Sequence, residues 1–243
     1  AGLRLARAGI ETLVIDQANG VSEDFRASTL HPPTLEMLDE LGLTEGLIAH
    51  GLVSPTWQIR RHETHDKAMF DLVVLAGDTR YPFRLQCEQR VLTRMADELA
   101  RRTANLEVAY GAELTGLVQD EGGVTATVQT AHGTETIRAR YLVAADGARS
   151  ICRKLTGMTF SGETYPETTI LATTPFRFED HLPGLSNVNY VWCEQGTFSL
   201  LRLPEIWRCS LYSDPDESIE QALEPAAIER KLQRIVPRSQ PYE

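Results

Sequence analysis

Residues 141–153 read YLVAADGARSICR, and this stretch decides the fold. Its first five residues are apolar or aromatic and predict a buried strand that ends at Asp146 and Gly147. An acid and a glycine at a strand end can present a carboxylate to sugar hydroxyls while the bare backbone lets a ligand approach closely. Arg149 and Arg153 follow, and their planar guanidinium groups suit phosphate oxygens. The stretch therefore predicts a strand end that binds a nucleotide.

The sequence begins AGLRLARAGIETLVIDQ, which predicts the end of a helix followed by a strand. Gly9 is well placed to end the helix, and a run rich in β-branched residues leads from there to Asp16. In a Rossmann unit the acid that ends this strand hydrogen-bonds the ribose of a bound dinucleotide, so Asp16 is a candidate contact. A Gly-rich turn is expected about 20 residues before such an acid. We therefore expect the sequence to start inside the first helix of a dinucleotide-binding fold, with Gly2 in that helix.

Residues 25–42 read FRASTLHPPTLEMLDELG and predict a short helix behind an Arg-Ala pair. The two prolines are expected to block the helix before Thr34, which is a good N-cap, and Gly42 is expected to stop it. The prolines also favour an extended segment around Arg26. On its residues alone, Arg26 is either a ligand contact or a solvated surface side chain.

Residues 83–102 contain a second predicted helix, which starts at Gln89 and has an apolar stripe that faces the core. Its first residues follow the pattern Glu-Gln-x-x-Leu, and Gln89 lies where a side chain and free amides can meet an anionic ligand or simply cap the helix. Together with the strand ends at Asp16 and Asp146 and the unit headed by Arg26, this pattern resembles the FAD-dependent aromatic hydroxylases. These enzymes are also called group A flavoprotein monooxygenases, and para-hydroxybenzoate hydroxylase is one of them.

The resemblance implies FAD and NAD(P)H as cofactors. Reduced nicotinamide would pass a hydride to FAD, and reaction with O2 would hydroxylate an electron-rich phenolic or polyketide-like ring, so no catalytic side chain is predicted. The implied cofactor contacts are Asp16, Arg26, Gln89, Leu114, Asp146, Gly147, Arg149 and Arg153. Leu114 is implied by the resemblance alone, through its backbone beside the adenine. Asp146 has an equally simple alternative, which is to cap its own turn.

The strand pattern completes the predicted fold class. Residues 106–139 predict a parallel strand and an antiparallel meander, and residues 168–213 predict a second, largely antiparallel sheet. We expect an α/β fold in which a Rossmann-like FAD-binding domain carries the meander and an α+β substrate domain carries the second sheet. The FAD-binding domain is assigned to residues 1–53 and 88–157, and the substrate domain to residues 54–87 and 158–243. The resemblance also implies truncation at both ends.

In the family, the second sheet forms one wall of the aromatic pocket. The candidates for that wall are Tyr190, Trp192, Phe198, Arg202, Trp207 and Tyr212. Because side chains alternate along a strand, we expect about half of them to face the other side. A final helical region is expected over residues 218–236, with Pro225 as a boundary.

Composition excludes several classes of protein. The net charge of −10 argues against a general nucleic-acid surface. The apolar runs are far shorter than the roughly 20 residues of a membrane span. The four cysteines show neither zinc-site spacing nor the density of a secreted scaffold, so reduced thiols and a cytoplasmic location are expected. The two histidines within residues 62–66 supply at most two converging ligands, so no metal site is predicted.

Two rival functions stay open at this point. One is a FAD-dependent oxidoreductase of the same fold that does not hydroxylate. Oxygen uptake coupled to formation of a hydroxylated product would distinguish the predicted hydroxylase from it. The other is an inactive remnant, since a chain without the Gly-rich loop is expected to retain little FAD. The expected partners are the aromatic substrate and O2, with a second copy of the chain if the protein is a homodimer.

Overall fold

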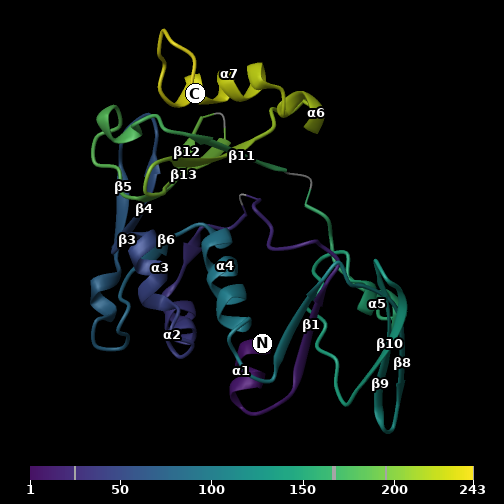
Figure 1. Cartoon of the computed structure of the whole chain (residues 1–243). Coiled ribbons are helices and arrows are strands. Elements are labelled where there is room, and N and C mark those ends of the chain that lie inside the picture. The colour runs from purple at the N-terminus through teal and green to yellow at the C-terminus, as the bar shows by residue number, and fades with distance from the viewer. Residues whose placement is uncertain (25, 166–167, 195, 243) are drawn as a thin grey trace. The chain divides into compact units, whose positions relative to one another are not determined.

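The computed structural model describes residues 1–24, 26–165, 168–194 and 196–242. They form two compact units (Figure 1). The first unit comprises residues 1–24 and 93–164, and the second comprises residues 25–92 and 165–243. The predicted α/β class is confirmed, with a parallel strand pair, a β-meander and a largely antiparallel second sheet.

In the first unit a short helix packs on a parallel strand pair. Helix α1 spans Gly2–Arg7, and strand β1, Thr12–Asp16, pairs in parallel with β7, Leu106–Tyr110. The helix before the strand and the helical position of Gly2 are as predicted. A Cβ on Gly2 would lie 2.9 Å from Val14 Cγ2, so glycine allows α1 to approach β1 this closely.

An antiparallel meander follows, as the alternating pattern predicts. Strand β8 spans Glu113–Asp120, β9 spans Gly123–Thr130 and β10 spans Gly133–Ala139, in the order β10-β9-β8. Ala126 and Val128 on the central strand are buried in the small core of this unit. The meander therefore has one apolar face and one solvated face, which is usual for antiparallel sheets.

Residues 141–145 do not form the predicted strand. Tyr141 is 86% and Val143 66% exposed, and the segment joins no ladder in the described part of the chain. An apolar run becomes a strand only where a neighbour offers its hydrogen-bonding edge. Because β1 and β7 bond to each other and not to this segment, the prediction is wrong here. Helix α5, Ile151–Leu155, follows the turn at its end.

Two helices lie in the N-terminal part of the second unit. Helix α2 spans Pro32–Asp39 and α3 spans Thr44–His50. The prediction that the prolines block the helix before Thr34 is wrong, because α2 begins at Pro32 itself. Proline fits the first positions of a helix, where its fixed φ is suitable and no N–H is needed.

A small three-stranded sheet and a third helix are the next elements. Strands β2, Thr29–Leu30, and β3, Leu52–Ser54, flank β6, Arg84–Gln86, and both pairings are antiparallel. Helix α4 spans Gln89–Ala100 and starts at Gln89, as predicted; its residues from Thr93 onward belong to the first unit.

The largest sheet of the second unit has six strands among the described residues. Its order is β11-β14-β13-β12-β4-β5, and all neighbours are antiparallel except β4 and β12. The strands are β4 Thr56–Arg61, β5 Lys67–Asp71, β11 Thr169–Thr174, β12 Val188–Cys193, β13 Gly196–Arg202 and β14 Trp207–Tyr212. Strand β5 ends at Asp71, because a 3-10 helix, η1, spans Leu72–Leu75. A second one, η2, spans Phe178–Asp180.

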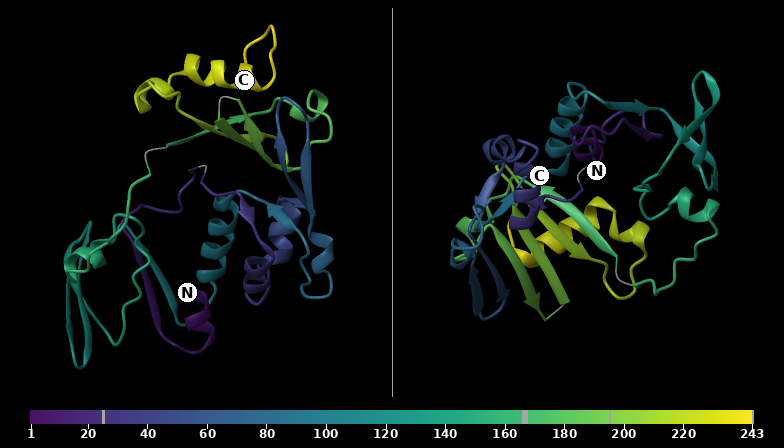
Figure 2. Two further views of the ribbon diagram at one scale, coloured as in Figure 1. Left: turned by 180° about the vertical axis from the view of Figure 1, so that it is seen from behind. Right: turned by 90° about the horizontal axis from the view of Figure 1, so that it is seen from below.

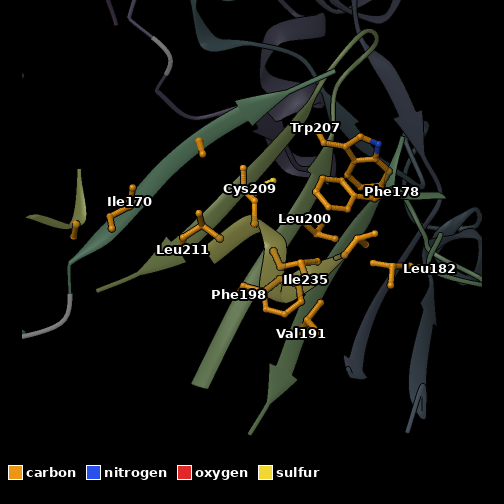
Figure 3. Packing of buried hydrophobic residues seen from close by; sticks show 14 residues of the cluster. Ile170, Phe178, Leu182, Val191, Phe198, Leu200, Trp207, Cys209, Leu211 and Ile235 are labelled. Atoms are coloured by element: carbon orange, nitrogen blue, oxygen red, sulfur yellow. The ribbon is translucent and has the colours of Figure 1, made fainter. Parts of the chain in front are cut away.

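Helices cover one face of this sheet. Helices α6, Ile219–Ala222, and α7, Pro225–Ile235, follow the last strand, and α7 lies across the sheet in the views of Figure 1 and Figure 2. Figure 3 shows the core of this covered face, in which Phe178 and Leu200 are 0% exposed. Burial of apolar surface between sheet and helix is the main force that holds this unit together. Pro225 begins α7, as expected.

We expect Leu200→Ala to lower the free energy of unfolding by about 2–5 kcal/mol, because it leaves a cavity in a closely packed core. Urea unfolding followed by far-UV circular dichroism measures the loss. Leu171→Ala on β11 is the matched control, because Leu171 is 42% exposed on the opposite face of the sheet, and a change of less than about 1 kcal/mol is expected. Equal losses for the two variants would contradict this account of the core.

Candidate functional site

Asp16 lies at the carboxyl end of β1 with an exposed side chain. The backbone N–H of Ala18 donates to its Oδ1 at 2.8 Å, which fixes the carboxylate at the start of the following turn. The strand end therefore presents an oriented acid, as the Rossmann pattern predicts for a ribose contact.

The Asp146 carboxylate caps helix α5. Its Oδ2 accepts a hydrogen bond from the backbone N–H of Cys152 at 3.0 Å, and the Ser150 hydroxyl accepts one from Arg153 N at 3.0 Å. Gly147 turns the chain with φ +75°, a conformation that a side chain would strain. The hydrogen bonds from the Cys152 amide and the Ser150 side chain lower the pKa of Asp146 to about 2. The turn-capping role is therefore present, and the carboxylate is ionised at neutral pH.

The two arginines after this turn differ in their surroundings. Arg153 Nη2 donates to Ala148 O at 3.1 Å, and its guanidinium lies 4.9 Å from the centre of the Phe160 ring. Arg149 is exposed, and the structure shows no ion pair for it in the described part of the chain. Arg149 is therefore the more available of the two for a phosphate group.

Leu114 lies on β8, opposite Val128 and next to an irregularity in the ladder before Gly116. Its half-buried side chain packs on the meander core. Strand β8 contacts both β1 and α5, so the predicted contact residues of the first unit are carried by neighbouring elements.

In the second unit, the segments of Arg26 and Gln89 run side by side. The N–H of Gln89 donates to Ala27 O at 3.0 Å, and the N–H of Cys87 donates to Ser28 O at 2.8 Å. The two segments are far apart in the sequence, and the structure brings them together at Ala27, the residue that follows Arg26. Arg26 itself is exposed.

Two polar side chains that sequence reasoning missed adjoin this pairing. Arg208 on β14 donates through Nη1 to the Ser28 hydroxyl at 3.0 Å, and Gln86 Oε1 accepts from the Thr29 hydroxyl at 3.0 Å. In the described part of the chain, the buried donors Arg208 Nε and Gln86 Nε2 have no hydrogen-bond partner. Burial also lowers the pKa of Arg208. Unpaired buried donors are costly, and a ligand rich in acceptor atoms would satisfy them.

The open face of the six-stranded sheet holds a pocket of about 350 Å³. Tyr190, Trp192 and Tyr212 line it together with small hydroxyl side chains that include Ser199 and Ser210. Of the other predicted wall residues, Trp207 faces the covered side, where its Nε1 donates to Glu179 at 2.9 Å. Phe198 belongs to the core but also lines the pocket, and Arg202 pairs with Glu179. About half of the six candidates thus face the pocket, as alternation predicts.

Neither a metal cluster nor a membrane helix is found in the described residues. No group of three histidine, cysteine, aspartate or glutamate side chains is placed to hold a metal ion among them. No helix in the same residues is long and apolar enough to cross a bilayer.

A parallel βα unit with a β-meander, joined in sequence to an aromatic-faced sheet, defines a flavoprotein of the FAD-dependent monooxygenase fold. The sequence profile of the FAD binding domain family matches residues 1–239, and the chain belongs to that family. The predicted resemblance is thereby confirmed.

Named relatives are monooxygenases. The chain is 31% identical to para-nitrophenol 4-monooxygenase of Pseudomonas sp. (strain WBC-3), over 97% of this chain and 58% of that enzyme. It is 30% identical to pentachlorophenol 4-monooxygenase of Sphingobium chlorophenolicum, over 84% of this chain and 38% of that enzyme. The crystal structure of p-nitrophenol 4-monooxygenase from Pseudomonas putida DLL-E4 superposes with a TM-score of 0.90 at 29% identity, covering 99% of this chain and 60% of that one. The chain thus spans between about two fifths and three fifths of these relatives.

The Asp146 cap predicts a pH dependence of stability. Its folded pKa of about 2 lies below the ordinary 3.8, so its contribution to stability is complete above about pH 4 and is lost as the pH falls toward 2. Asp146→Ala should therefore lower the free energy of unfolding at neutral pH, and the difference from the unaltered protein should disappear near pH 2. Urea unfolding across this range measures it, with Asp216→Ala, an exposed acid outside the turn, as control. A difference that does not change with pH would contradict the cap.

Proposed function

We propose that this chain holds FAD and the ring of a small phenolic substrate for hydroxylation with NAD(P)H and O2. The observation that carries the proposal is the position of Arg208. Arg208 is the register partner of Leu201, which lines the open-face pocket, and it also bonds to Ser28 beside the Arg26–Gln89 pairing. A flavin ring that satisfies Arg208 Nε and Gln86 Nε2 would therefore border the aromatic pocket.

Bound FAD would supply the redox chemistry, by accepting a hydride from reduced nicotinamide and activating O2. The chain's own residues bind and orient. Asp16 would hold the ribose, Arg26 the ribityl chain or pyrophosphate, and Gln89 a further part of the FAD. The backbone at Leu114 would lie beside the adenine. The turn of Asp146 and Gly147, with Arg149 and Arg153, would contact the nicotinamide cofactor.

The domain assignment belongs to the same proposal. Residues 1–53 and 88–157 would form the FAD-binding domain, and residues 54–87 and 158–243 the substrate domain. A homodimer is proposed on the family resemblance. A cytoplasmic location is proposed on the same resemblance and because the four described cysteines are all free thiols.

The substrate class follows from the pocket wall. Tyr190, Trp192 and Tyr212 offer flat surface to an aromatic ring, and Ser199 and Ser210 offer hydroxyls to a polar substituent. The relatives named above act on para-nitrophenol and pentachlorophenol, and each of these substrates is a single substituted phenol ring. We therefore propose a substituted phenol as substrate.

Titration of the chain with FAD, followed by flavin fluorescence, tests the cofactor site. Arg26→Ala and Arg208→Gln should each raise the dissociation constant about tenfold, which corresponds to about 1.4 kcal/mol. Arg177→Ala is the matched control, because Arg177 is an exposed arginine whose partner is Asp180. The titration is carried to high FAD concentration, because weak retention is expected. Identical affinities for all three variants would overturn the assignment of Arg26 and Arg208.

Steady-state oxidation of NAD(P)H in the presence of a phenol tests the nicotinamide site and the reaction. Arg149→Ala should raise the apparent KM for the reduced nicotinamide roughly tenfold, because a charge-assisted phosphate contact is lost. Arg140→Ala, another exposed arginine, should leave it unchanged. Oxygen uptake must match a hydroxylated product, and NAD(P)H oxidation without such a product would favour a non-hydroxylating oxidoreductase.

A further inference from the structure

A second cavity lies in the second unit, away from the open-face pocket. It measures about 480 Å³ and shares no lining residue with that pocket. Its apolar walls come from Pro32 and Pro33 at the start of α2 and from Leu72 and Leu75 of η1, and Arg84 of β6 also lines it. The proposed flavin and substrate sites use none of these residues.

Arg84 has unused hydrogen-bonding capacity. Its Nε and Nη1 are buried and have no hydrogen-bond partner among the described residues, and no carboxylate of that part of the chain forms an ion pair with it. The guanidinium lies 4.4 Å from the centre of the Trp57 ring, so its position is fixed by a cation–π contact and not by an acid. His31, which also lines the cavity, has its pKa lowered first by desolvation and then by the charge of Arg84. The cavity therefore has a basic end.

Two acids also line the cavity, and each carboxylate already has either a hydrogen-bond donor or contact with water. Glu36 Oε1 accepts a hydrogen bond from the Thr79 hydroxyl at 2.6 Å, and Asp78 is exposed to water. The two buried guanidinium nitrogens of Arg84, which have no partner among the described residues, are the stronger determinant, because the free energy gained by pairing a polar group rises as its hydration falls.

We propose that this cavity binds a small aromatic carboxylate, with its ring between the prolines and leucines and its carboxylate on Arg84. The planar guanidinium can hold a carboxylate through two parallel hydrogen bonds, which an ammonium group cannot do. The cavity volume suits a ligand of one or two rings.

Ring contacts connect Arg84 with the open-face pocket. Trp57 is parallel to Phe70 at 4.0 Å and meets Tyr190 edge to face at 5.8 Å, and Tyr190 lines the open-face pocket. A carboxylate that binds Arg84 weakens its cation–π contact with Trp57. We therefore expect a ligand on Arg84 to change the fluorescence of Trp57, which contacts both Arg84 and Tyr190 of the proposed substrate pocket.

The test is benzoate binding to the whole chain without flavin or nicotinamide, measured by calorimetry and by tryptophan fluorescence. Arg84→Gln should weaken binding at least tenfold, and Arg84→Lys should weaken it less, because the charge stays and the planar fork is lost. Arg80→Gln is the matched control, because Arg80 is largely exposed and bonded to Asp39, and it should leave the affinity unchanged. Asp78→Asn should tighten binding, because a like charge at the cavity is removed. Trp57→Phe should abolish the fluorescence change while calorimetric binding persists.

Several results would overturn the proposal. Benzoate binding that is absent at millimolar concentration, or that equals the binding of toluene, would show that Arg84 recognises no carboxylate. Tighter binding of benzylamine than of benzoate would show that the acids dominate. Binding that survives Arg84→Gln and is lost in Tyr212→Ala would place benzoate on the open face. Circular dichroism confirms that each variant is folded, and no result depends on whether the chain binds FAD.

Discussion

The hydrogen-bonded pairing of residues 27–30 with residues 85–89 is the constraint on which the candidate site depends. Backbone bonds from Cys87 and Gln89 to Ser28 and Ala27, with the side-chain bond between Thr29 and Gln86, hold together two segments that are far apart in the sequence. Backbone groups that leave water must find such partners, so the pairing is obligatory once these segments are buried. It places Gln89 at the start of α4 next to the chain that leads to Arg26.

Polar groups whose burial is costly lie next to this pairing in the second unit. Gln86 is 0% and Ser28 3% exposed, and Arg208 reaches Ser28 from the six-stranded sheet. A buried donor without a partner costs free energy, and native structures retain few of them. Arg208 Nε and Gln86 Nε2 are such donors among the described residues. Their retention at one place is understandable if a ligand with acceptor atoms completes their hydrogen bonds.

The sequence predicts those elements whose signal is local. The apolar stripe and first residue of α4 and the alternation of the meander follow from periodicity, and both are confirmed. The run at residues 141–145 has an equally clear pattern, but a strand also needs a partner edge, which periodicity does not report. The role of Arg208 was missed for a similar reason. Its face of the sheet depends on the register of β13 with β14, and its neighbour Ser28 lies in a distant segment.

The six-stranded sheet is strongly asymmetric, and this asymmetry links stability to function. On the covered side, α7 adds both apolar packing and an ionic cluster in which the 6%-exposed Lys231 pairs with Glu217 and Asp214. On the open side, Trp192 is 57% and Tyr190 42% exposed, although burial of such large rings would stabilise the fold. A solvent-facing wall of aromatic side chains gives up that stabilisation, and such patches mark binding surfaces. Because α7 fixes the covered face, the sheet is a rigid support on which the ring of a substrate can be oriented without reorganisation of the core.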